Sequence, residues 1–155
     1  MSLLDRLHDL LRRQKPDVLD LDAPDLRVVT ESFNPIEADS AVLARSPNWR
    51  ADEPAVLRHH LLLPADRVTE AAATLAQDHW TLREVAGDSG PAEPVDSVQV
   101  REKAENRHLV RLHALRVQRL DALHCAQERA RMAGLAQRLD GESLGWDALQ
   151  PKTPG

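Results

Sequence analysis

Half of the chain's ten prolines lie between residues 16 and 54, and this uneven distribution divides the 155-residue chain into three regions. Proline fixes its own φ angle and has no N–H to donate, so it interrupts helices and inner strands. The five prolines are Pro16, Pro24, Pro35, Pro47 and Pro54. The same segment shows no sustained period of either strand or helix. We therefore predict an extended, largely irregular arm over residues 16–54, a regular domain over 55–150 and a short tail over 151–155.

The predicted arm is too apolar for a freely solvated linker, since large apolar side chains are spread along it, Phe33 and Trp49 among them. Such a segment is expected to lie on a surface, either of its own domain or of a partner. We take Phe33 and Trp49 as candidate partner-binding residues. Residues 17–54 also carry nine acidic against three basic side chains, and the whole chain has a formal net charge of −5. Direct binding to nucleic acid, which needs a basic face, is therefore not expected.

The first fifteen residues carry an amphipathic pattern. Five leucines fall within an arc of about 120° at the helical rotation of 100° per residue. They are Leu3, Leu4, Leu7, Leu10 and Leu11. We predict a helix over residues 3–13, which Pro16 prevents from continuing. Three roles stay open for it: docking in a groove of a partner protein, lying on a membrane surface, or folding back on the chain's own sheet. We take the five leucines as candidate partner-binding residues.

The region after residue 54 alternates between strand-like and helix-like patterns. The predicted elements are a strand at 55–63, a helix at 65–77, a strand at 80–85, extended runs at 97–103 and 107–117, a helix at 118–139, and a short final strand or turn at 142–149. This order is typical of an α+β sandwich of the ferredoxin-like, split βαβ kind. In the last helix, Leu123 and a row of alanines form a face of small residues that could lie close on the sheet, while Met132, Leu135 and Leu139 lie on another side. Two apolar sides predict burial of both.

Two stretches, "RHHLLLPADRVTEAAATLAQDHWTLREV" and "RMAGLAQRLDGESLGWDAL", resemble the RraB-like proteins, which are regulators of ribonuclease E activity. The resemblance covers about residues 55–149. The residues that carry it are His59, His60, Trp80, Gly145 and Trp146. It implies a ferredoxin-like fold without enzymatic activity, and a function exerted by binding a ribonuclease E-type enzyme. It also implies that Trp146 packs as a plug that closes the sandwich, with Gly145 giving the backbone room to approach. The alternative is that Trp146 is an exposed binding anchor.

Seven histidines and one cysteine raise the question of metal or catalytic chemistry. His59 and His60 are adjacent, so on a strand they point to opposite faces and do not easily bind one ion. His59 shares its face with leucines, which predicts a hydrogen-bonded core histidine. Cys125 lies among alanines and is interpreted as a small buried apolar residue. We expect no catalytic residues, no metal and no cofactor.

The sequence thus favours a non-enzymatic binding protein of the cytoplasm. A single cysteine fits a reducing compartment, and no apolar run approaches the roughly 20 residues that span a bilayer. The first candidate partner is a ribonuclease E-type enzyme. The alternative is an accessory subunit whose N-terminal helix and arm dock on a large assembly, such as the cytoplasmic face of a respiratory or other membrane complex. In that case peripheral association with the inner face of the membrane would come through the partner.

Overall fold

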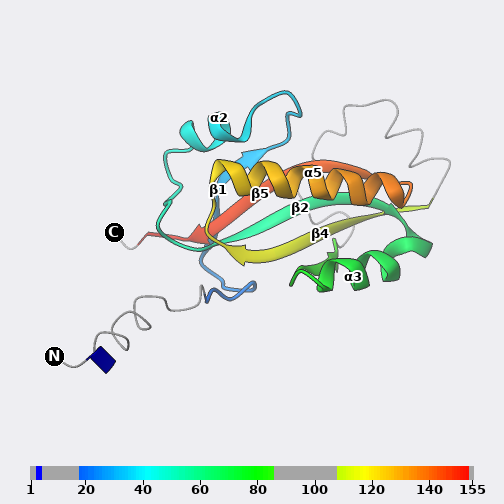
Figure 1. Ribbon diagram of the computed structural model, residues 1–155, viewed down its shortest axis with the longest axis horizontal. Helices are drawn as coiled ribbons and strands as arrows, with labels where there is room; N and C mark the ends of the chain where they lie inside the picture. Colours follow the sequence, from blue (N-terminus) through cyan, green and yellow to red (C-terminus); the bar gives the residue numbers. More distant parts are fainter. Residues whose placement is uncertain (1–2, 5–17, 86–107, 154–155) are drawn as a thin grey trace.

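The computed structural model describes residues 3–4, 18–85 and 108–153. In these residues five strands form one antiparallel sheet, accompanied by three helices and one turn of 3-10 helix (Figure 1). The elements in chain order are β1 (Leu26–Ser32), α2 (Asp39–Ala44), β2 (Ala55–Pro64), η1 (Ala65–Arg67), α3 (Val68–Ala76), β3 (Thr81–Glu84), β4 (Leu109–Gln118), α5 (Ala122–Arg138) and β5 (Glu142–Pro151). The chain is therefore α+β, as predicted. The predicted run at 97–103 and most of the predicted helix at 3–13 lie outside the described residues.

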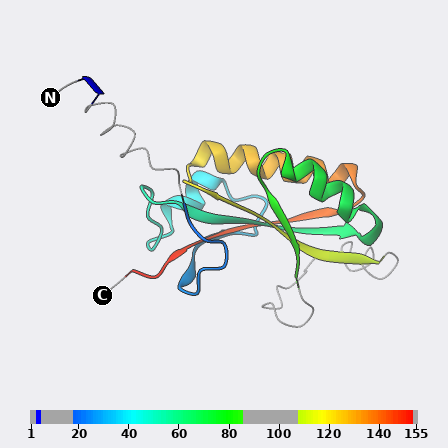
Figure 2. The same cartoon turned by 90° about the horizontal axis from the view of Figure 1, so that it is seen from below.

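The strand order in the sheet is β1-β5-β2-β4-β3. From β2 onward the chain runs strand, helix, strand, strand, helix, strand, and the last of these strands returns to lie beside the first. This arrangement is compatible with the predicted ferredoxin-like sandwich. Strand β1 adds a fifth strand outside β5. Figure 2 shows α3 and α5 on the same face of the sheet, and we call the opposite one the back face.

Strand β2 is the centre of the domain because it pairs with both β4 and β5. Its alternation sends Leu57, Leu61 and Leu63 toward the helices, where each is fully buried. They join a core built almost entirely from aliphatic side chains and two tryptophans. Helix α2 contributes Val42 and Leu43, and helices α3 and α5 contribute Ala71, Leu75, Cys125, Met132, Leu135, Ala136 and, just after α5, Leu139.

Helix α5 buries only one of the two apolar sides that were predicted to be buried. Met132, Leu135 and Leu139 are at most 4% exposed, whereas Leu123 is 64% exposed and the small side chains beside it face outward. The outward-facing alanines are Ala126, Ala130 and Ala133. The reason is area: larger apolar side chains remove more apolar surface from water than alanines do. The prediction that the side with Leu123 and the alanines is buried is wrong.

The segment before β2 is also more regular than predicted. Residues 26–32 form β1, paired with β5, and residues 39–44 form α2. Strand β1 escapes a search for alternation because a bulge between Val28 and Thr30 shifts its register, and because its two fully buried side chains are polar. Helix α2 has only six residues, too few to display a helical period. The described part of residues 16–54 is therefore not an irregular arm.

Candidate functional site

The candidate partner-binding residues lie in different surroundings. Leu3 and Leu4 are 77% and 68% exposed. Leu7, Leu10 and Leu11 are outside the described residues. Phe33 is half-buried, with its ring centroid 5.0 Å from that of His60, and Trp49 packs against the core. Both rings contribute to the packing of this chain, and their role in docking stays a prediction.

Four of the five motif residues taken from the family resemblance lie on inner strands of the sheet, namely His59 and His60 on β2 and Gly145 and Trp146 on β5, whereas Trp80 directly precedes the edge strand β3. His59 points toward the helices and His60 toward the back face, as expected for neighbours on a strand. His59 is 1% exposed and its ring meets Trp80 edge to face, with centroids 5.4 Å apart. In the described part of the chain neither ring nitrogen of His59 has a hydrogen-bond partner, so the predicted hydrogen bond is not found. Burial lowers the pKa of His59 to about 3, and the charge of neighbouring His60 adds to this effect.

Trp146 is fully buried, as a packing residue should be. Its indole Nε1 donates a hydrogen bond to Asp39 Oδ1 at 3.1 Å, and the same carboxylate oxygen lies 2.9 Å from Arg129 Nη2. Arg129 also donates to Ser32 Oγ and to the Glu37 carbonyl. This network joins β1 and α2 to α5 and β5. The sequence analysis did not identify Asp39 or Arg129 as functional or structural residues. Asp39 lies 90 residues from Arg129 and 107 residues from Trp146, and contacts over such separations leave no local pattern.

Gly145 allows this arrangement through its backbone. Its φ is +137°, a conformation that side chains rarely permit, and an added Cβ would lie 2.4 Å from the Ser32 carbonyl oxygen. The expectation that Gly145 gives the chain room is thus met at a specific place, the contact with residues 32 and 33.

A polar cluster occupies the back face. Arg58 donates two hydrogen bonds to Asp147, at 2.8 and 2.5 Å, and His60 Nε2 lies 3.1 Å from the same carboxylate. The ring of His113 meets that of His60, with centroids 4.4 Å apart. Strand alternation could have revealed part of this cluster, since Arg58 and His60 are two apart on one strand. Asp147 lies on β5, a segment that was harder to recognise as a strand because it contains Gly145.

The charges of the cluster are largely neutralised within it. Burial opposes ionisation of Asp147, but hydrogen bonds from Arg58 and His60 outweigh that effect and hold the pKa of the carboxyl below its usual value. Burial lowers the pKa of His113 to about 4, and the charges of His60 and Arg58 act in the same direction. A carboxylate fixed by a two-pronged arginine is already stabilised as an anion. This geometry suits structural pairing of β2 with β5 better than acid–base catalysis.

Residues 18–25 run along the same back face (Figure 2). Asp22 accepts a hydrogen bond of 2.6 Å from Arg83 on β3, and Lys152 N donates to the Asp25 carbonyl at 2.8 Å, beyond the end of β5. The Asp22 carboxylate is 70% exposed, and ion pairs so exposed contribute little to stability.

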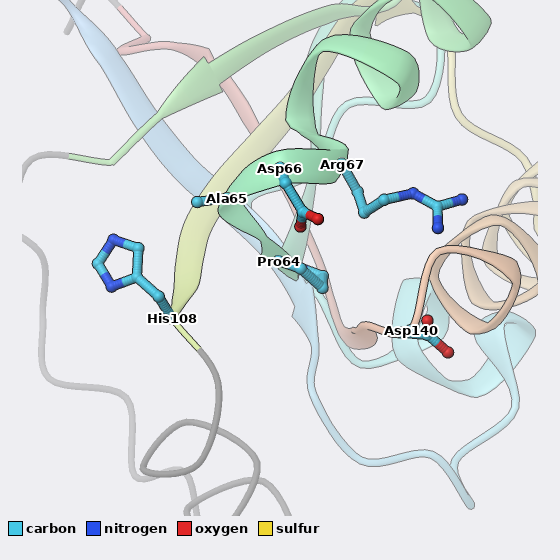
Figure 3. Close-up of a pocket in the computed structure, with 6 residues that line it drawn as sticks. All are labelled: Pro64, Ala65, Asp66, Arg67, His108 and Asp140. Atoms are coloured by element: carbon cyan, nitrogen blue, oxygen red, sulfur yellow. The ribbon is translucent and has the colours of Figure 1, made fainter.

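A pocket of about 400 Å³ lies where β2 ends and β4 begins. Its lining includes Asp66, Arg67, His108 and Asp140. Figure 3 shows His108 on one side of Pro64 and Asp140 on the other, so these polar groups do not converge on one point. No group of three potential metal ligands occurs among the residues that the structure describes. Cys125 is buried in the core, and burial raises its thiol pKa to about 12, which disfavours the nucleophilic thiolate.

A second concave surface has a different character. A groove of about 440 Å³ lies between the loop into α2 and the first turns of α5, which are neighbours in Figure 1. Its rim carries the most exposed large aliphatic side chain in the described residues, Ile36 at 91%, together with Leu123 at 64%. We call this surface the α5 groove, and its lining residues are Pro35, Ile36, Glu37, Ala38, Asp39, Ser40, Ala122, Leu123, Ala126 and Arg129.

The charged residues of the α5 groove are paired with near neighbours. Asp39 pairs with Arg129, and Glu37 pairs with Arg45 at 2.7 Å. The remaining lining side chains are apolar apart from Ser40. Sequence reasoning missed Leu123 as a surface residue because it assigned Leu123 to a buried side of its helix.

Comparisons of this chain with protein-family models, with curated proteins and with solved structures find no match. The resemblance to the RraB-like proteins stays a prediction from the motifs quoted above. Within the part of the chain that the structure covers, every helix is too short or too polar to cross a membrane.

Proposed function

We propose that this chain is a non-enzymatic regulator of the cytoplasm that acts by binding another protein, with a ribonuclease E-type enzyme as the first candidate partner. The observation that carries the proposal is the α5 groove, where Ile36 and Leu123 are exposed together. Single exposed aliphatic side chains are common on protein surfaces, but contiguous ones mark interaction sites. Because Asp39, Arg129 and Glu37 already have charged partners, an apolar segment could cover the groove without leaving a charge unpaired.

The proposal is tested with a purified ribonuclease E-type enzyme and a labelled RNA substrate. The wild-type chain should bind the enzyme and slow RNA cleavage, and the double variant Ile36→Asp/Leu123→Asp should do neither. Val18→Asp is the matched control, since Val18 is an aliphatic residue that is 81% exposed and lies outside the groove. A wild-type chain that neither binds the enzyme nor slows cleavage would refute the enzyme as partner. Equal activity of the groove variant would refute the groove as the binding surface.

A second candidate function is the accessory subunit of a large assembly. The observation that favours it is the exposure of Leu3 and Leu4, which lie at the start of the leucine pattern. In that case the chain should sediment with a large complex in a gradient of native lysate, and Leu3→Asp/Leu4→Asp should release it. Truncations for this purpose should end before Leu26, because β1 belongs to the sheet.

A further inference from the structure

The back face of the sheet carries an apolar patch near the end where β2 begins and β5 ends. Alternation along the strands brings five aliphatic side chains onto this face. They are Val28, Val56, Leu115, Val117 and Leu149, and we call them the back-face patch. Val56 and Leu115 are 1% and 7% exposed, although α3 and α5 lie on the other face of the sheet (Figure 2). A cover other than these two helices must therefore shield them.

Residues 18–25, which we call the strap, are in the right place to provide that cover. Lys152 N, just past the end of β5, donates to the Asp25 carbonyl at 2.8 Å. Arg83 on β3 donates to Asp22 Oδ1 at 2.6 Å. Strands β2 and β4 lie between β5 and β3 in the sheet, so the path from one contact to the other passes over the middle of the back-face patch.

The strap alternates two kinds of side chain. Leu19, Leu21 and Ala23 are half-buried, whereas Asp20 and Asp22 between them are exposed. Half-buried apolar side chains in a segment that lies along the sheet indicate contact with the sheet. The strap therefore presents an apolar edge to the back-face patch, and an acidic edge to solvent and to Arg83.

Few contacts hold the strap in place. The Arg83 guanidinium lowers the pKa of Asp22 and the two side chains form an ion pair, but they are 43% and 70% exposed, and pairs so exposed contribute little to stability. Within the described residues, the other hydrogen bonds of the strap, apart from the one at Asp25, stay inside it or reach the adjoining Leu26. Segments with so few contacts open at a low cost in free energy, and binding regions are drawn from them.

We propose that the back-face patch is a docking surface for a segment of a partner protein that alternates aliphatic and acidic side chains, and that the strap occupies this surface in the free protein. The strap shows the chemistry that fits, with aliphatic side chains for the patch and a carboxylate for Arg83. Val28 is 46% exposed, so part of the patch is accessible even with the strap in place. The surface lies on the other side of the sheet from the α5 groove, so this inference does not rest on the proposed function.

The first test determines whether the pair of Asp22 with Arg83 closes the strap. Full-length Asp22→Arg places two cations side by side, so backbone order parameters of residues 18–25 should fall from about 0.85 to below about 0.6 in nitrogen-15 relaxation. The swapped pair Asp22→Arg/Arg83→Asp should restore the wild-type values. Glu84→Arg makes the same change of charge at an exposed position of β3 that faces the helices, and should leave the strap ordered. A strap that stays ordered in Asp22→Arg would overturn the proposal.

The second test adds the acetylated and amidated peptide VLDLDAPD, the sequence of residues 18–25, to each full-length protein. Binding is followed through the amide shifts of Val56 and Leu115 at peptide concentrations up to about 5 mM, which detects dissociation constants near 1 mM. Asp22→Arg should bind the peptide at least about tenfold more tightly than wild type, because the wild-type strap occupies the surface. Asp22→Arg/Arg83→Gln, which lacks the cation, should bind it more weakly than Asp22→Arg.

A peptide of the same composition with its residue types grouped, VLLAPDDD, is the matched control and should not bind. Failure of Asp22→Arg to bind VLDLDAPD, or equal binding of the grouped peptide, would overturn the docking surface. A wild-type dimer in light scattering that Asp22→Arg dissociates would assign the face to a second copy and overturn the partner segment. A short single-stranded RNA that binds Asp22→Arg when the peptide does not would overturn it in favour of nucleic acid.

Discussion

At the scale of single residues, His59 is the group whose burial has the clearest thermodynamic consequence. It is 1% exposed, both its ring nitrogens lack a partner in the described residues, and its pKa is lowered to about 3. The folded protein therefore holds this ring neutral where an unfolded chain would protonate it. A polar ring without hydrogen bonds also costs folding free energy at any pH.

We expect acid sensitivity from this residue. Because the folded pKa lies below the unfolded value near 6.5, the unfolded chain binds a proton first, and stability falls as pH drops from about 6.5 toward 3. The loss attributable to His59 is roughly 2 kcal/mol by pH 5. His113, with its pKa near 4, acts in the same direction but is partly solvated, so its effect is smaller. His59→Leu should flatten the dependence of urea unfolding on pH, whereas His108→Leu, at an exposed position, should not. An unchanged slope in His59→Leu would contradict this account.

Two glycines offer a matched pair of substitutions to alanine. Gly145→Ala forces a side chain at a φ of +137° and places its Cβ 2.4 Å from the Ser32 carbonyl oxygen. We expect a loss of about 2–4 kcal/mol in the free energy of unfolding. Gly134 lies within α5, and the nearest atom to its added Cβ is the Arg138 guanidinium at 3.6 Å. Gly134→Ala should therefore stabilise by up to about 1 kcal/mol. Equal effects of the two substitutions in chemical denaturation would show that the contact with β1 is not restrictive.

At the scale of secondary-structure elements, the long regular segments could be predicted and the irregular ones could not. The predicted strand at 55–63 and helices at 65–77 and 118–139 correspond to β2, η1 with α3, and α5. Strand β5 was expected as a short strand or turn and has ten residues. Its glycine, which signals a turn in isolation, is here required by a contact from β1 that no local pattern reveals.

The candidate site was harder to predict than the fold because it depends on tertiary contacts that leave no local pattern in the sequence. The face that a helix buries depends on what the helix packs against, and the sequence of α5 has two apolar sides. The outcome placed Leu123 in solvent and Met132 in the core. Pairs such as Arg58 with Asp147 and Asp39 with Arg129 join residues about 90 apart, so only the tertiary structure brings them together.

Asp39 is one of the residues that attach α2 to the rest of the domain, together with the buried Val42 and Leu43, and its removal should be costly. Asp39→Ala takes the acceptor from Trp146 and one partner from the half-buried Arg129. We expect a loss of about 2–4 kcal/mol in the free energy of unfolding. Glu37→Ala, which breaks only the more exposed pair with Arg45, should cost less than about 1 kcal/mol. Urea unfolding followed by circular dichroism compares the two, and a similar cost for both would mean that the Asp39 network does not hold α2.

At the scale of the whole molecule, the first described third of the chain is part of the domain and not an appendage. Strand β1 pairs with β5 from Leu26 to Ser32. Gln150, fully buried on β5, accepts a hydrogen bond from Arg50 N and donates one to the Arg50 carbonyl, each at 2.9 Å. Trp49 packs against the core at the same place. These contacts link residues about 100 apart in sequence, so the segment before β2 cannot detach without exposing β5.

Cooperative unfolding is the consequence that distinguishes this arrangement from the extended arm predicted over residues 16–54. In a variant that keeps only Trp49 (Trp80→Phe/Trp146→Phe), fluorescence reports on the N-terminal segment, while circular dichroism reports on all strands and helices. Both signals should change at the same urea concentration, because one sheet contains β1 and β5 alike.

The same coincidence is expected in a variant that keeps only Trp146 (Trp49→Phe/Trp80→Phe), whose fluorescence reports on the core. This second protein controls for destabilisation by the substitutions. If residues 18–54 formed a separate unit, the fluorescence of Trp49 in the first variant would change at a lower urea concentration than the circular dichroism signal. In the second variant, the fluorescence of Trp146 would still change together with the circular dichroism signal. Hydrogen exchange provides an independent check: if unfolding is cooperative, the hydrogen-bonded amides of Leu26–Ser32 should exchange with a free energy close to that of the amides in residues 55–63.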